Sequence, residues 1–101
     1  MEKKNYRHGD VLLIPVATIP KQATKQKNLV LAEGEVTGHS HQITEGVAHL
    51  FKWDEKMYLK VKSERAALTH EEHKRIDLPA GDYEVFIQRD YEPNGWKKVI
   101  D

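Results

Sequence analysis

Four of the six histidines of this chain fall in two short clusters whose residue types and spacing could support chemistry. They are His39 and His41 in the first cluster, and His70 and His73 in the second. The first two are separated by one residue, so on a β-strand both imidazoles project from the same face. The second two are three residues apart, which is the spacing of one helical or turn face. Two such pairs brought together predict a metal site, whereas a single pair predicts acid–base chemistry.

The four histidines are therefore candidate metal ligands, and His39, His41 and His70 are also candidate catalytic residues. Neutral imidazole binds divalent zinc, iron, nickel and manganese, so a transition-metal cofactor of this kind is expected. His70 follows an apolar Ala-Ala-Leu run and is a better candidate than His73, which is followed by Lys74 and Arg75. An open coordination position would indicate catalysis, and a closed tetrahedral one would indicate a structural metal.

The first cluster lies in the glycine-bracketed stretch GEVTGHSHQITEG, residues 34–46. This stretch resembles the first metal motif of the cupin family, which has a glycine, then His-x-His, then a glutamate three or four residues later. The resemblance implies that His39, His41 and Glu45 are metal ligands inside a small β-barrel. The chain also has Pro79-Ala80-Gly81, similar to the start of the second cupin motif, but no histidine follows it closely.

Two further histidines lie outside these clusters. His8 precedes Gly9 and Asp10, just before the first predicted strand. We expect it to be a structural imidazole bonded to the Asp10 carboxylate or to the turn backbone. The alternative is an orienting pair at a cleft edge, since a carboxylate partner raises the basicity of a histidine. His49 lies in the middle of a predicted strand and is expected to be packed and hydrogen-bonded rather than a ligand.

Short strands separated by turn residues are the elements that must position these side chains. Strands are predicted at residues 11–16, 28–33, 47–52, 57–62 and 83–88. The best hairpin candidate joins the third and fourth strands through the polar turn at residues 54–56. Residues 78–82 are predicted to be a turn that feeds the last strand. Residues 63–67 could form a helical turn, and Thr69 could cap a short helix through the second histidine cluster.

This pattern predicts an all-β fold, a small barrel or sandwich with at most one short helix. We expect one domain spanning residues 1–101, because the chain has a common single-domain length and shows no linker or repeat. There is no cysteine, so disulfides and thiolate metal sites are excluded. No apolar run approaches the roughly 20 residues that span a bilayer. We therefore expect a cytoplasmic protein that has no membrane partner.

The composition leaves three classes of function open. Lys plus Arg and Asp plus Glu both number 16, a balance that disfavours generic polyanion binding and leaves nucleic acid uncertain. The leading hypothesis is a metal-binding protein with a histidine-rich site that is either structural or catalytic; if catalytic, it would be a hydrolase acting on a small molecule or phosphoester. The second is a metal-independent phosphodiesterase or ribonuclease that acts on RNA or cyclic nucleotides. The third is a non-enzymatic homo-oligomer that uses the aromatic residues Tyr58, Tyr91 and Trp96 at its interface.

Overall fold

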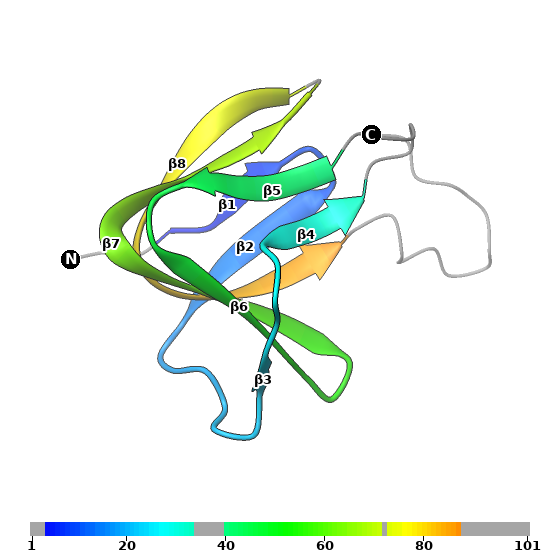
Figure 1. The fold of residues 1–101 in the computed structure, drawn as a ribbon, viewed down its shortest axis with the longest axis vertical. Helices are drawn as coiled ribbons and strands as arrows, with labels where there is room; N and C mark the ends of the chain where they lie inside the picture. The colour runs from blue at the N-terminus through cyan, green and yellow to red at the C-terminus, as the bar shows by residue number, and fades with distance from the viewer. Residues whose placement is uncertain (1–3, 34–39, 72, 88–101) are drawn as a thin grey trace.

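The computed structural model describes residues 4–33, 40–71 and 73–87, and it shows an antiparallel sheet that curls into a half-barrel (Figure 1). Within these ranges the strands are β1 (Tyr6–His8), β2 (Val11–Val16), β3 (Thr24–Lys25), β4 (Val30–Glu33), β5 (Ser40–Glu45), β6 (Ala48–Trp53), β7 (Lys56–His70) and β8 (His73–Ile87). The described residues include no helix, which confirms the predicted all-β class. The helical turn expected at residues 63–67 and the helix start expected at Thr69 were wrong, because both segments belong to β7.

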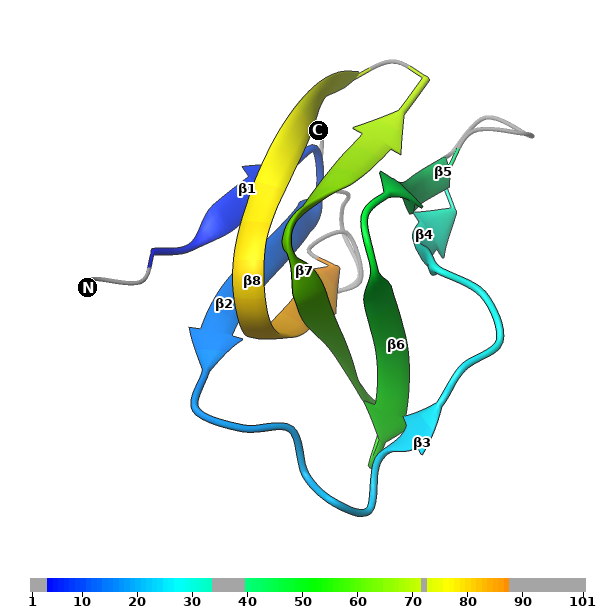
Figure 2. The ribbon, with the colours of Figure 1, turned by 60° about the vertical axis from the view of Figure 1, so that its left-hand side comes forward.

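Two 15-residue strands, β7 and β8, form the centre of the sheet. The strand order is β1-β2-β8-β7-β5-β4, and β6 pairs with β7 and with β3. The first part of β7 pairs with β6 and the last part pairs with β5. Figure 2 shows β8 bending along its length, so that its C-terminal part pairs with β2 and its N-terminal part approaches β1. This curvature brings β1 close to the residues at the start of β8.

The hairpin of β6 and β7 confirms the strongest sequence-based prediction. Its register runs from Ala48↔Val61 to Trp53↔Lys56, so Asp54 and Glu55 alone make the turn. Both turn residues have positive φ, 54° and 62°, as a two-residue type I′ turn requires. Aspartate tolerates this conformation better than most residues, and the flanking alternation supplies the strands.

A corner in β7 separates its two pairing partners. The register shifts between Val61 and Arg65, which marks a bulge. Ser63 fills this bulge: its hydroxyl accepts the Val47 N–H at 2.9 Å and donates to the Arg65 carbonyl at 2.7 Å. Gly46, with φ of +97°, packs so closely that a Cβ there would lie 2.5 Å from the Arg65 carbonyl oxygen. The corner therefore needs a residue without a side chain at position 46.

The turn predicted at residues 78–82 was wrong, because β8 continues through this segment. Pro79 faces Arg65 immediately after the bulge in β7, and β2 pairs with β8 only from Asp82 onward. Proline is tolerated here because it lies beyond the end of the β2 ladder. The curved strand β8 therefore includes a Pro-Ala-Gly sequence that in isolation favours a turn.

The core lies on the concave side of the curled sheet and is built from alternating strand residues. Its fully buried members include Val11, Leu13, Leu50, Leu59, Leu68 and Leu78. Tyr58 is also buried, so the expectation that it forms part of an exposed interface was wrong. Tyr91 and Trp96 lie outside the described residues.

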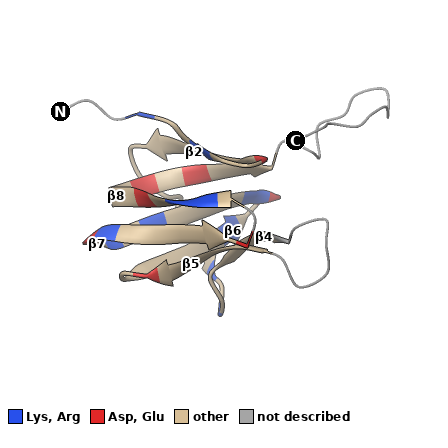
Figure 3. Ribbon diagram, turned by 90° about the horizontal axis from the view of Figure 1, so that it is seen from above, with Lys and Arg blue, Asp and Glu red and all other residues tan. Residues whose placement is uncertain are grey.

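The charged residues are distributed over the sheet without a face of one sign in the view of Figure 3. β7 carries mainly lysine and arginine, whereas β8 has basic residues near its start and acidic residues further along. Among the described residues there is no helix with the length and apolarity needed to cross a bilayer.

Candidate metal centre

Three neighbouring strands, β5, β7 and β8, each carry one histidine to the same end of the sheet. His70 and His73 are register partners in the β7–β8 ladder, so their side chains share a face. The β5–β7 ladder includes Gln42↔Thr69, and continuing its register by one residue sets His41 opposite His70. Strand pairing alone therefore gathers these three imidazoles from positions far apart in the sequence.

The three rings are in contact with one another. Ring centroids are 4.3 Å apart for His41 and His70, 4.7 Å for His70 and His73, and 5.5 Å for His41 and His73. One nitrogen of each ring can be chosen so that all three lie within 4.8 Å of one another. His41 is 2% exposed, His70 is half-buried and His73 is exposed. The cluster thus has a buried end and an end that faces solvent.

His8, at the end of β1, forms the buried side of the cluster. Its Nε2–H donates to the carbonyl oxygen of Lys74 in β8 at 2.9 Å. Its Nδ1 lies 2.9 Å from the Nδ1 of His41, a distance that requires one proton between the two nitrogens. His8 is only 3% exposed. It therefore joins the backbone beside His73 to the side chain of His41.

The turn between β1 and β2 adds a carboxylate and a close backbone approach. Asp10 is 5% exposed, and its Oδ1 lies 3.4 Å from Nε2 of His41. Gly9 has φ of +64°, and a Cβ on it would lie 2.7 Å from Nε2 of His73 and 2.9 Å from Cε1 of His41. Such contacts are too short for any side chain, so glycine is what lets the turn lie against the two rings.

The environment of the cluster keeps its buried histidines neutral. The pKa of His41 is lowered to about 4, chiefly by burial and next by the nearby His70 and His8, while the Asp10 carboxylate opposes the shift. Burial also lowers the pKa of His8, although its bond to the Lys74 carbonyl opposes the shift. Neutral imidazoles present lone pairs, which is the form that binds metal ions.

The sequence-predicted site residues divide into three groups. His41, His70 and His73 lie together, and His39 lies outside the described residues. Glu45 is exposed at the end of β5, where its carboxylate accepts hydrogen bonds from Arg75 at 3.4 and 3.5 Å. Its role as a ligand therefore stays a prediction that rests on the family resemblance alone. His49 lies in β6, outside the cluster.

Sequence reasoning did not place His8 and Asp10 with the other histidines. The expected partner of His8 was the Asp10 carboxylate or the turn backbone; His8 bonds to His41 and to the backbone of Lys74, and Asp10 contacts His41. The available signal was the His8-Gly9-Asp10 sequence itself, in which a glycine separates two groups able to bind or orient a metal ligand. This sequence alone does not reveal the bend of the sheet that brings β1 close to the start of β8.

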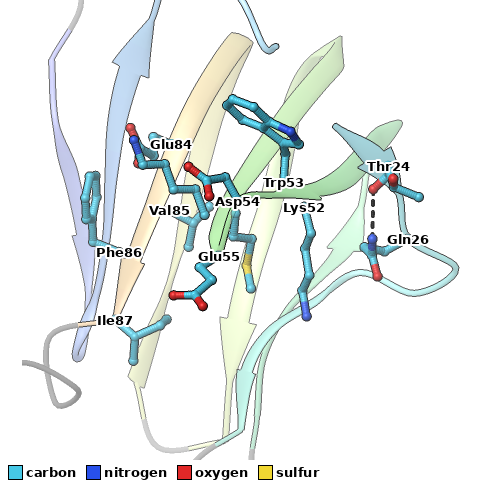
Figure 4. Close-up of a pocket in the computed structure, with 12 residues that line it drawn as sticks. Thr24, Gln26, Lys52, Trp53, Asp54, Glu55, Glu84, Val85, Phe86 and Ile87 are labelled. Atoms are coloured by element: carbon cyan, nitrogen blue, oxygen red, sulfur yellow. Dashed lines mark hydrogen bonds between the residues drawn. The ribbon is translucent and has the colours of Figure 1, made fainter. Parts of the chain in front are cut away.

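A cavity of about 720 Å³ lies elsewhere, at the opposite end of β7 from the histidines. Figure 4 shows it between the β6–β7 turn and the end of β8, with Trp53 and Phe86 at its margins and Asp54 between them. None of the lining residues is a histidine. The histidine cluster therefore lies apart from this cavity.

Comparison with known proteins identifies a family to which no function has been assigned. The model of the family described as "Domain of unknown function (DUF8820)" matches residues 7–88. No curated protein and no solved structure matches the chain significantly. The matched range includes the whole cluster, from His8 to His73. The chain therefore belongs to the DUF8820 family of domains of unknown function.

Proposed function

We propose that this protein binds a divalent transition-metal ion through His41, His70 and His73 and uses it to activate water. The observation that carries this proposal is the convergence of one nitrogen from each ring to within 4.8 Å. Zinc, iron, nickel and manganese remain the candidate ions, since imidazole ligands suit each of them. His39 and Glu45 remain predicted additional ligands.

The distances are compatible with a metal after modest side-chain movement. A tetrahedral zinc ion with ligand distances of about 2.0–2.1 Å sets its ligand atoms about 3.3–3.4 Å apart. The 3.4 Å between His41 Nε2 and Asp10 Oδ1 already matches this separation. The remaining nitrogens need to approach by about 1.5 Å at most, which rotation of the less buried His70 and His73 side chains can supply.

The charge balance also favours a cation. Burial lowers the pKa of His8 and of His41 and so favours their uncharged forms, whereas the Asp10 carboxylate beside His41 contributes a negative charge. A divalent ion held by the three histidines would offset that charge at short range. Asp10 would then be a fourth ligand or a hydrogen-bond acceptor for a metal-bound water.

Access from solvent supports a catalytic rather than a closed structural site. His73 is exposed, so a metal held there would keep a coordination position open to water. Such a metal lowers the pKa of bound water toward about 7 and polarises carbonyl or phosphoryl oxygens. A small ester or phosphoester is the substrate class that this chemistry fits.

The test is metal content and affinity, measured on protein purified without a histidine tag. We expect the wild type to hold a stoichiometric amount of zinc, iron, nickel or manganese after reconstitution, and His41→Ala, His70→Ala and His73→Ala to lose it. His49→Ala is the matched control, because it removes a histidine outside the cluster and should retain the metal. Failure of the wild type to bind any of the four ions would refute the proposal.

Hydrolysis is tested separately, with bis(4-nitrophenyl) phosphate and 4-nitrophenyl acetate as probes. Turnover that requires the metal and disappears in His73→Ala would support the activity. Turnover of RNA or cyclic nucleotides in chelator would instead support the metal-independent alternative. That alternative has less support, because His41, with a pKa lowered to about 4, is a poor general acid at neutral pH.

A further inference from the structure

We infer that His8 is a positioning residue of this centre: it accepts the Nδ1–H of His41 and thereby presents the bare Nε2 of His41 to the metal. The inference rests on the proposed metal site and adds a residue that binds no metal itself. It follows from three contacts of two buried rings.

The first step fixes the proton on one nitrogen of His8. Its Nε2 lies 2.9 Å from the Lys74 carbonyl oxygen, and a carbonyl can only accept a hydrogen bond. Nε2 of His8 therefore carries a proton. If His8 is neutral, its other nitrogen, Nδ1, has none.

The second step assigns the proton between the two rings. The Nδ1 atoms of His8 and His41 are 2.9 Å apart, so only one of them is protonated. A proton on Nδ1 of His8 would make that ring an imidazolium, which is unfavourable for a side chain that is 3% exposed. The proton therefore belongs to Nδ1 of His41, and His8 accepts it.

The third step concerns the other nitrogen of His41. A neutral ring protonated at Nδ1 has a lone pair at Nε2. This lone pair lies 3.4 Å from Oδ1 of Asp10, so a cation bound to Nε2 would also lie beside a carboxylate that attracts it. By accepting the Nδ1 proton of His41, His8 thus leaves Nε2 of His41 available to a metal.

The same contacts tie His8 to a second part of the site. Lys74 follows His73 in β8, so the bond from His8 to the Lys74 carbonyl holds the backbone next to that ligand. His8 therefore connects His41 of β5 with the start of β8 through a single buried ring. Ligand-bound histidines usually donate to a carboxylate or a carbonyl, and here a second histidine takes that role.

The tautomer is tested in the metal-free protein by long-range proton–nitrogen correlation spectra of the histidine rings. We expect His41 to be protonated at Nδ1 and His8 at Nε2 in the wild type. In His8→Phe, we expect the His41 proton to move to Nε2, where it can bond to Asp10. Finding His41 protonated at Nε2 in the wild type would overturn the inference, whether or not the protein binds metal.

The consequence is tested by titrating His8→Phe and His8→Gln with Zn²⁺. Glutamine keeps one acceptor and one donor and should preserve affinity, whereas phenylalanine should weaken it by about 10- to 100-fold. His49→Phe is the control for replacing a histidine elsewhere, and it should bind as the wild type does. Equal affinity of His8→Phe and the wild type would refute the positioning role. A wild type that binds no zinc, with the expected tautomers, would refute the metal site alone.

Discussion

At the scale of single residues, the cluster depends on Gly9 as much as on the histidines. A Cβ at position 9 would meet the ring atoms of His73 and His41 at 2.7 and 2.9 Å. These atoms belong to the side chains that we propose as ligands, so any added side chain has to displace them. The glycine thus sets how closely the β1–β2 turn can approach the site.

We therefore predict that Gly9→Ala lowers Zn²⁺ affinity by at least about 10-fold, because displaced ligands lose their geometry. The positive φ of +64° adds a cost of about 1–2 kcal/mol to folding. Calorimetric titration measures the affinity, and urea unfolding measures the stability. Gly81→Ala is the control: its φ is +148°, but its nearest neighbours are 4.0 Å away and belong to Tyr83. Equal zinc affinity in the two variants would contradict this role of Gly9.

The sequence predicted three of the described site histidines and missed the other members. His41, His70 and His73 stand out because clustered histidines are visible in the chain itself. His8 does not stand out, because its place in the site depends on contacts with His41, 33 residues away, and with the Lys74 carbonyl, 66 residues away. Of the two faces expected for His70 and His73, the helical one was wrong and the turn one was right, since the two residues are register partners that flank the connection between β7 and β8.

At the scale of elements, the corner at residues 61–65 determines which strand β7 pairs with. Before it, β7 pairs with β6, and after it, β7 pairs with β5, which carries His41. Gly46 packs against this corner at the link between β5 and β6. The position of His41 in β5 relative to His70 in β7 thus depends on the contact of Gly46 with this corner, at the other end of the β5–β7 pair.

We predict that Gly46→Ala destabilises the protein by about 2–5 kcal/mol. About 1–2 kcal/mol comes from the positive φ of +97°, and the remainder from overpacking against the Arg65 carbonyl. Chemical denaturation measures the difference, with Gly81→Ala as a reference that has a positive φ but open space. Equal stability of the two variants would show that the close contact at position 46 adds nothing to the destabilisation.

The elements that could be predicted are those determined locally. The β6–β7 hairpin follows from alternation and a polar two-residue turn, and the strand at 11–16 follows from its apolar run. The run through Pro79 and Gly81 was misassigned, because pairing with β7 overrides its turn propensity. The bulge in β7, which shifts the β7–β8 register beside Pro79, cannot be recognised from the residues around Pro79 alone.

At the scale of the whole molecule, the curl of the sheet brings β1 against the start of β8 and buries two histidines between them. His8 and His41 are almost fully buried, and burial is the main cause of the lowered pKa of each. In the unfolded chain both return to an ordinary value of about 6.5. Between these values the unfolded state binds more protons than the folded state, so stability rises with pH there.

We predict that the metal-free protein loses stability as the pH falls from about 6.5 through about 4, the interval set by His41. The contribution of His41 to stability is fully present above that interval, because His41 is then neutral in both the folded and the unfolded state. As the pH falls, protons bind more readily to the unfolded state, so its population increases. Urea unfolding in chelator, at neutral pH and at about pH 5, measures the change. His41→Gln should show a shallower pH dependence, whereas His49→Gln should keep most of the wild-type dependence, because the pKa of His49 is also lowered but His49 is less buried than His41. A wild-type stability that stays constant over this interval would mean that the curled sheet does not hold His41 in its neutral form.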